Sequence, residues 1–257
     1  WTCGIMAFKA TAAGIAAESP SQKTGNAPAS PAATIVQAFP NNVQAGSLVI
    51  VVCGKNGNNA FVAGDCTKTA GTSTLSAFTL DKVQTNATDQ VIGIWSALVT
   101  GTGSLTVTVS TTPTSPSSFI AVDAYTGSWD SNRVEATNGA TFSTSTTPSS
   151  GNATSAGAAL FIGGLAVGNS LVVTLTQDSP FVSIFESLAG DLREVGEGIS
   201  QIVSSGTTDA AGWTINLAPN QSSVAVVVYR EAISAGAIKQ SVSAQNVAAG
   251  GTLSSGN

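Results

Sequence analysis

The chain has 257 residues, of which 9 are Lys or Arg, 14 are Asp or Glu and none is His, so the formal net charge is −5. Charged residues make up 9% of the sequence, against about 25% in an ordinary soluble domain. The absence of histidine excludes Ser-His-Asp and Cys-His relays and His-ligated zinc. The acidic balance argues against binding of nucleic acid, which needs clustered Lys and Arg.

Short apolar runs rich in Val, Ile and Thr, separated by Gly, Asn, Pro and Ser, predict strands along the chain. Residues 1–12 are expected to form a first strand and 13–32 an extended linker. The further predicted strands are 34–39, 47–53, 91–99, 105–110, 119–125, 158–165, 171–176 and 224–229. Because only residues 185–195 resemble a helix, the sequence predicts an all-β protein.

Residues 155–176 carry no charge and could be mistaken for a membrane span. They contain Gly163-Gly164 and the turn sequence Gly168-Asn169-Ser170. Two short strands therefore explain the stretch better than a helix of ~20 apolar residues, and we expect no membrane span.

An internal repeat is visible in the strand sequences. The stretch 45–54 (AGSLVIVVCG) resembles 156–164 (AGAALFIGG), and 117–125 (SSFIAVDAY) resembles 222–229 (SSVAVVVY). Two similar halves, about 33–127 and 143–232, would open and close with these strands. We expect one jelly-roll-like antiparallel β-sandwich built from the two halves, and two small sandwiches in tandem are the alternative.

A third copy of the closing motif is split between the two ends of the chain. Residues 240–244 and 248–252 repeat the pattern of 201–205 and 210–214, but no strand follows them in the predicted hairpin 233–257. The matching strand is Trp1–Lys9, which has the same order of small, apolar, aromatic and basic residues as Ser222–Arg230. Coincidence between two strands of simple composition is the alternative.

In these strands the chain resembles a loosely defined group of secreted and phage-encoded jelly-roll β-sandwich structural domains. The shared pattern is Ala-Gly-Ser-Leu-Val-Ile-Val-Val, then Thr-Val-Thr-Val, then an apolar strand ending in Tyr-Thr-Gly, over residues 31–232. The resemblance implies a structural or adhesive domain, and it carries over no catalytic residue.

Three cysteines are present, at positions 3, 53 and 66. We favour a disulfide between Cys53 and Cys66, because the Thr-, Ser- and Asn-rich composition is typical of extracellular proteins. Two buried thiols are the alternative. Cys3 is then left to be buried or to pair with another chain.

Carboxylates are too scattered in the sequence to indicate a catalytic pair, so we expect no enzyme activity and no cofactor. Asp123 lies inside an apolar strand, where a structural hydrogen bond or an ion pair with Arg133 or Lys82 is favoured over an acid of raised pKa. The cluster of Asp191, Glu194 and Glu197 could hold Ca²⁺, but its spacing matches no calcium loop, and a solvated face beside Arg193 is the favoured interpretation. We therefore expect no metal site.

Four aromatic residues could together form a platform on which a sugar ring stacks: Trp95, Trp129, Trp213 and Tyr125. Tryptophans on the strands of a sandwich are more often part of the core. Exposure of these side chains in a shallow groove would favour a carbohydrate-binding or adhesive module that recognises surface glycans.

The leading hypothesis is a structural subunit of an extracellular filament or of a virion surface, whose partners are copies of itself. An unpaired sheet edge after residue 257 invites pairing with another chain. We predict that residues 1–9 of one copy add a strand beside 240–257 of a neighbour and bury Ile5, Met6 and Phe8. A tandem array cut at an arbitrary point would leave the same sequence signature.

Overall fold

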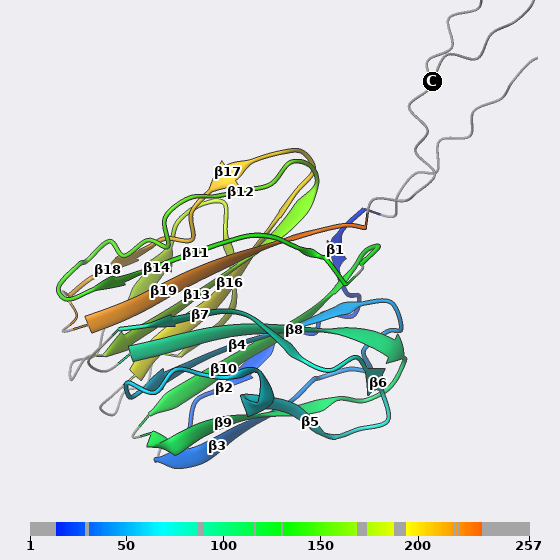
Figure 1. The fold of residues 1–257 in the computed structure, drawn as a ribbon, viewed down its shortest axis with the longest axis horizontal. Helices are drawn as coiled ribbons and strands as arrows, with labels where there is room; N and C mark the ends of the chain where they lie inside the picture. The colour runs from blue at the N-terminus through cyan, green and yellow to red at the C-terminus, as the bar shows by residue number, and fades with distance from the viewer. Residues whose placement is uncertain are drawn as a thin grey trace, which may run out of the picture. The chain divides into compact units, whose positions relative to one another are not determined.

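Antiparallel strands form nearly all of the regular structure, which confirms the all-β prediction (Figure 1). The computed structural model describes residues 14–28, 31–86, 90–115, 117–129, 131–168, 174–187, 194–217, 219 and 221–232. These residues belong to one unit, Ala12–Ala232. None of the described residues forms a helix long and apolar enough to cross a membrane.

The strands before residue 127 are β1 (Ala16–Ala17), β2 (Thr24–Asn26), β3 (Ala32–Ala38), β4 (Leu48–Asn56), β5 (Cys66–Ala70), β6 (Thr74–Leu75), β7 (Thr79–Thr85), β8 (Gln90–Gly101), β9 (Thr106–Ser115) and β10 (Ser118–Thr126), with a 3-10 turn η1 (Ala63–Asp65). The strands after residue 133 are β11 (Val134–Phe142), β12 (Ala153–Thr154), β13 (Ala159–Gly168), β14 (Leu175–Gln177), β15 (Val182–Ser187), β16 (Glu194–Val203), β17 (Thr208–Asp209), β18 (Trp213–Ile215) and β19 (Gln221–Arg230).

Strands from the first part of the chain form two sheets. The central sheet has the order β1-β10-β4-β8-β6, with β2 also paired to β10 and β7 also paired to β8. The outer sheet has the order β3-β9-β5. Strand β9 carries the predicted alternation, because Val107 and Val109 are fully buried while Thr106 and Thr108 are partly exposed.

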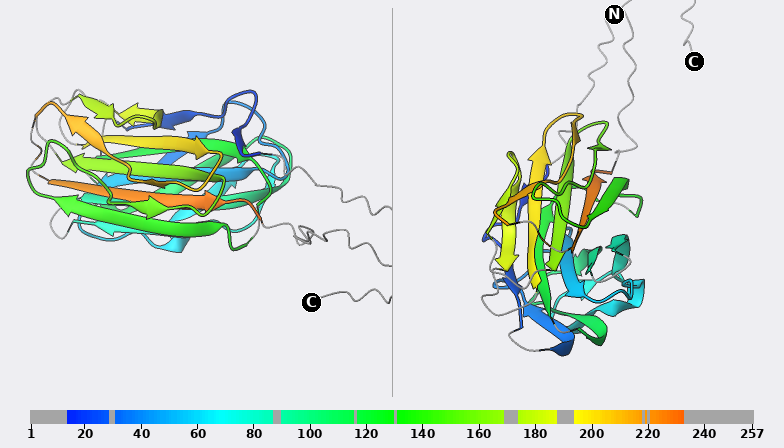
Figure 2. Two further views of the ribbon diagram at one scale, coloured as in Figure 1. Left: turned by 90° about the horizontal axis from the view of Figure 1, so that it is seen from above. Right: turned by 90° about the vertical axis from the view of Figure 1, so that its left-hand side faces the viewer.

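Strands from the second part of the chain form one large sheet and two short pairs. The second sheet has the order β11-β19-β13-β16-β15. The short pairs are β12 with β17 and β14 with β18. Figure 2 shows the strands of neighbouring sheets running in roughly the same direction, as in aligned sheet packing.

Three apolar cores separate four layers, which follow one another from the outer sheet to the short pairs in Figure 1. The central sheet is buried on both faces. In β4, Val49 and Val51 pack toward the outer sheet, whereas Ile50 and Val52 pack toward the second sheet. This double burial explains why the β4 sequence is a continuous apolar run rather than an alternating one.

Glycines on β16 allow the central and second sheets to approach closely. A Cβ atom on Gly196 would lie 1.9 Å from Cε1 of Phe119, and one on Gly198 would lie 2.8 Å from Cβ of Ala121. Since Phe119 and Ala121 are fully buried on β10, neither has room to move away. These two positions of β16 therefore accept no side chain without a shift of the sheets.

The structure differs from the sequence prediction in two segments. Residues 185–195 are not helical where they are described, because 185–187 end β15 and 194–195 begin β16. Residues 128–142, left without an assigned strand, contain the edge strand β11, which pairs with β19. The predicted N-terminal strand 1–12 and the hairpin 233–257 lie outside the described residues, and the segment expected to be a linker contains β1 and β2.

Candidate functional site

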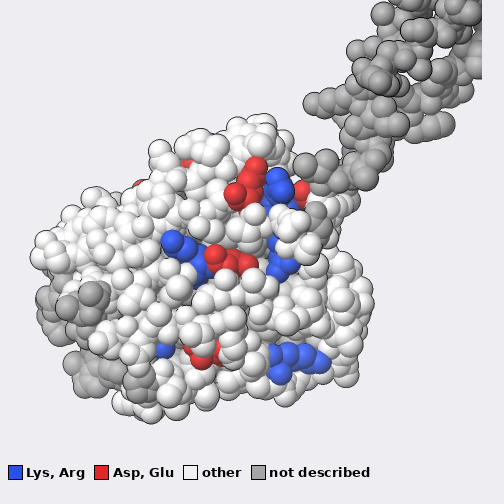
Figure 3. Space-filling view, viewed as in Figure 1, with Lys and Arg blue, Asp and Glu red and all other residues white. Residues whose placement is uncertain are grey.

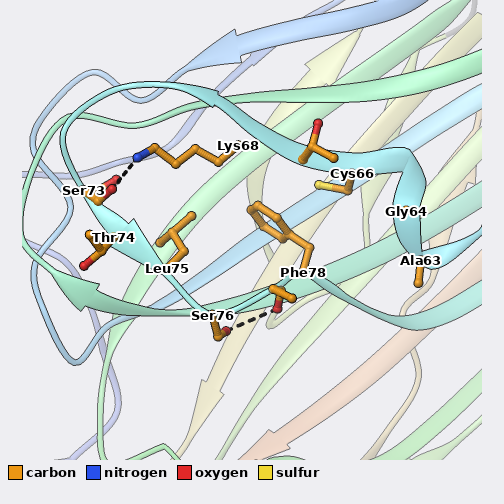
Figure 4. A pocket seen from close by; sticks show the side chains of 11 residues that line it. Ala63, Gly64, Cys66, Lys68, Ser73, Thr74, Leu75, Ser76 and Phe78 are labelled. Atoms are coloured by element: carbon orange, nitrogen blue, oxygen red, sulfur yellow. Dashed lines mark hydrogen bonds between the residues drawn. The ribbon is translucent and has the colours of Figure 1, made fainter.

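A groove of about 580 Å³ lies between β5 and the segment 73–78, which contains β6 (Figure 4). Cys66, Leu75 and Phe78 line it together with Lys68 and Ser73. The Lys68 ammonium donates a hydrogen bond to the Ser73 carbonyl oxygen, as the dashed line in Figure 4 marks. The groove therefore combines an apolar wall with a cation that already has a partner.

The wall of the groove contains the thiol of Cys66. Burial raises the pKa of the Cys66 thiol well above its usual range, and the charge of Asp65 raises it further. A thiol with a raised pKa stays protonated at neutral pH and reacts slowly, because the thiolate is the nucleophile. The Cys66 thiol is therefore suited to packing in the wall of the groove rather than to reaction as a thiolate.

The structure corrects the predicted disulfide. Cys53 and Cys66 are both present as buried thiols. Cys53 lies on β4 in the central sheet and Cys66 begins β5 in the outer sheet, and both belong to the core between those sheets. Burial of both residues in apolar surroundings, the alternative to a disulfide, agrees with the common place of cysteine in protein cores.

A buried polar cluster, here called the Tyr229 cluster, joins the central and second sheets. The Tyr229 hydroxyl donates to Oδ2 of Asp81 at 2.7 Å, and the Ser96 hydroxyl also donates to that oxygen. Arg133 donates to the Ser96 hydroxyl through Nε at 3.1 Å and through Nη2 at 2.8 Å. Burial raises the pKa of Asp81, while Ser96, Tyr229 and Arg133 oppose that rise.

A second buried cluster, the Tyr125 cluster, contains the predicted Asp123. Oδ1 of Asp123 accepts the Ala124 N–H at 2.9 Å, and burial raises the pKa of this carboxyl to about 6. Tyr125, the Ala124 N–H and Lys23 lower that pKa, and Glu18 raises it. The favoured structural hydrogen bond is therefore present. The cation that lowers the pKa of Asp123 is Lys23, whereas Arg133 contacts Ser96 in the Tyr229 cluster.

Glu197 is buried on β16 rather than on a solvated face, which corrects the expectation for that residue. Its Oε2 accepts the indole N–H of Trp213 at 2.8 Å, and burial raises its pKa. Asp191, Arg193 and the side chain of Glu194 lie outside the described residues. Among the residues that the structure describes, no three Cys, Asp or Glu side chains gather as a metal site would require.

The aromatic residues do not form the platform considered for a sugar ring. Trp95, Trp213 and Tyr125 are at most 1% exposed. Trp129 is partly buried, and its indole N–H donates to the Tyr125 carbonyl oxygen at 3.1 Å. Trp95 packs edge-to-face on Phe61, with ring centroids 5.0 Å apart.

The sequence reasoning missed most of the residues that surround the two clusters. Asp81 lies on β7, where no strand was predicted, and Lys23 lies in the segment expected to be a linker. One signal was available: the two similar closing strands both end with Tyr, at positions 125 and 229. The predicted strand-exchange residues Ile5, Met6 and Phe8 lie outside the described residues.

Comparison of the chain with family models, with curated proteins and with solved structures finds no match.

Proposed function

We propose that this protein is a structural subunit of an extracellular filament or of a virion-surface assembly, built as a jelly-roll-like β-sandwich from two similar halves, called copies below. The carrying observation is a repeated strand order. The central sheet contains the order β10-β4-β8-β7, and the second sheet contains β19-β13-β16-β15. Across each sheet, the series runs from the strand that closes the repeat to the strand that opens it, and then to the two strands that pair beyond it.

Equivalent residues occupy equivalent positions in the two series. Tyr125 pairs with Leu48, and Tyr229 pairs with Leu160. Likewise, Ser96 pairs with Ile50 in the central sheet, and Ser200 pairs with Ile162 in the second sheet. Burial raises the pKa of both tyrosines, and contact with Ser96 opposes that rise for Tyr229 as contact with Ser200 does for Tyr125. Each tyrosine therefore faces the serine of the other copy. This reciprocal contact is what two copies related by a twofold axis would make.

In both copies the closing strand is flanked by a strand from the preceding segment. Strands β1 and β2 pair with β10, and β11 pairs with β19. A unit whose last strand takes its neighbour from the segment before it can be linked in series. The proposed exchange of residues 1–9 between subunits extends the same principle from one chain to the next.

The surface composition suits contacts between copies. In the view of Figure 3, charged atoms gather in a few small groups and the rest of the face is uncharged. Contacts between hydroxyl and amide surfaces need no desolvation of ions, which is the costly step when charged surfaces are brought together.

Deletion of residues 1–9 tests this proposal. We expect the deleted protein to remain folded but to sediment as a monomer, whereas the full chain assembles into particles visible by electron microscopy. The control replaces 1–9 with a Gly-Ser segment of equal length. Assembly by either altered protein would contradict strand exchange, and a covalently longer chain in native material, measured by mass spectrometry, would favour the tandem array.

A further inference from the structure

A smaller cavity, of about 310 Å³, opens beside the Tyr125 cluster, between the β1 edge of the central sheet and the end of the second sheet at β15 and β16. Its lining residues are Ala17, Lys23, Tyr125, Pro180, Val182, Ser200, Gln201 and Ile202. A volume at the lower limit of small-molecule sites suits an occupant the size of a single ring.

The polar floor of this cavity has unmet hydrogen-bonding capacity. Oε1 of Gln201 is buried and has no hydrogen-bond partner among the described residues. The Tyr125 hydroxyl is also buried, and although Asp123 and Ser200 lie close enough to shift its pKa, neither contact has the geometry of a hydrogen bond. Tyr125 is 1% exposed and Gln201 is 8% exposed. Oδ2 of Asp123, on the same strand and face as Tyr125, is also without such a bond. Leaving a buried polar atom unpaired costs about 1–3 kcal/mol.

The chemistry of these atoms specifies the occupant. A carboxylate oxygen and an amide oxygen only accept hydrogen bonds, so the occupant has to bring donors. Lys23 donates to the Ser183 carbonyl oxygen at 3.2 Å and lowers the pKa of Asp123, whereas Glu18 raises it. Because cation and carboxylates lie together, a strongly charged ligand meets attraction and repulsion at once, and a neutral ligand is favoured.

The rim of the cavity is apolar. Val182 is 50% exposed and Ile202 is 43% exposed, and both lie beside Pro180 at the mouth. These apolar side chains at the rim offer a surface that the C–H face of a bound ring can cover. A molecule with hydroxyl groups on its edge and a C–H face would fit both the polar floor and the apolar rim of the cavity.

We propose that this cavity binds a neutral polyhydroxylated ring, namely a single monosaccharide residue at the end of a glycan. Ring hydroxyls would donate to Oε1 of Gln201 and to the Tyr125 hydroxyl and accept from Ser200. The ring face would cover Val182 and Ile202. This site is independent of how subunits assemble, and it differs from the aromatic platform, whose residues are mostly in the core.

The test is a titration of the full chain with D-glucose, D-galactose, D-mannose, N-acetyl-D-glucosamine and L-fucose, followed by amide chemical shifts in NMR. At least one sugar is expected to shift the amides of Val182, Ser200 and Gln201, with a Kd of about 1 mM. Gln201→Leu and Tyr125→Phe should each weaken binding about fivefold, as expected for loss of one hydrogen bond.

Tyr229→Phe is the matched control, since it removes the equivalent hydroxyl at a distance from the cavity, and it should leave the Kd unchanged. If either cavity variant fails to fold, Ile202→Ser on the exposed rim replaces it, with the same expected weakening. Absence of shifts with all five sugars, equal shifts with glycerol, or equal weakening by Tyr229→Phe would overturn the proposal.

Discussion

The Tyr229 and Tyr125 clusters occupy equivalent positions between the same two sheets, yet they satisfy their polar atoms differently. Tyr229 donates to Asp81, which also accepts from Ser96. The Tyr125 hydroxyl lies near Asp123 and Ser200, which shift its pKa, but neither it nor Oδ2 of Asp123 has a hydrogen bond of good geometry among the described residues. The same pair of packed sheets thus holds one cluster whose Tyr hydroxyl is hydrogen-bonded and one, beside a cavity, whose Tyr hydroxyl is not. The comparison separates a hydroxyl with a structural role from one that is available to a ligand.

The difference has a simple geometric origin. Asp81 reaches Tyr229 from β7, a strand of the other series, so the carboxylate and the hydroxyl approach from facing sheets. Asp123 lies on the same strand as Tyr125, two residues earlier, and side chains at that spacing stand side by side rather than opposed.

The largest expected effect on stability comes from disturbing the packing of the central sheet against the second sheet, between which both clusters lie. Gly196→Val places atoms where Phe119 already lies, so we expect a loss of about 3 kcal/mol or more in the free energy of unfolding, measured with urea. Gly157→Ala is the control, because a Cβ at Gly157 meets no atom within 4 Å. A stable Gly196→Val protein would mean that the sheets are not held at this spacing.

The next effect distinguishes the clusters by pH. Asp123 has a folded-state pKa of about 6 against 3.8 as the ordinary value, so the folded protein binds this proton more tightly than the unfolded chain. Its contribution to stability is therefore greatest below about pH 4 and falls as the pH rises through 6, by roughly 2–3 kcal/mol.

Asp123→Asn should remove that fall. The free energy of unfolding should be measured with urea at about pH 4 and at about pH 8. From the lower to the higher pH, the stability of the variant relative to the wild type should rise by roughly 2 kcal/mol. A constant difference between the two proteins would show that Asp123 does not hold its proton more tightly when folded.

A smaller effect compares the two hydroxyls directly. Tyr229→Phe leaves Asp81 with one donor fewer and should cost about 1–2 kcal/mol of unfolding free energy. Tyr125→Phe removes a hydroxyl without a well-formed bond and should change stability by less than about 0.5 kcal/mol. Equal losses in the two variants would mean that the clusters are equally saturated.

The smallest effect concerns the core on the other face of the central sheet, where Cys53 and Cys66 lie. A reducing agent should leave the melting temperature unchanged to within about 1 °C, because no bond joins the two thiols. A disulfide closing this loop would contribute about 3 kcal/mol, and its reduction would lower the melting temperature clearly. Native thiol titration should detect neither residue until the protein unfolds.

Strands buried on both faces were the most predictable part of the fold. The apolar runs around β4, β10, β13 and β19 were visible because their side chains enter two cores at once. Edge strands were missed, since β7 and β11 have partly exposed, polar sequences without clear alternation. Strand β16 was missed because Gly196 and Gly198 lower its strand character, although their small size is what the packing requires.

The site could be predicted only in part. Asp123 was recognised as buried because its strand is apolar, but its neighbours come from distant segments and no spacing in the sequence brings Lys23 to it. Similarly, Tyr125 and Tyr229 both end apolar closing strands, although Asp123 precedes the first by two residues and Val227 precedes the second. Which of them finds a carboxylate opposite depends on the packing of two sheets.

Burial of the central sheet on both faces affects how the register between its strands is determined. A slip of β4 by one residue would exchange its two apolar faces, and hydrophobicity alone would not oppose the exchange, because Leu48–Val52 is fully buried throughout. Side-chain size opposes it instead: a Cβ at Gly54 would lie 2.3 Å from Phe119. Along this apolar run, the steric fit between large side chains and glycines therefore contributes to selecting the correct pairing of the strands.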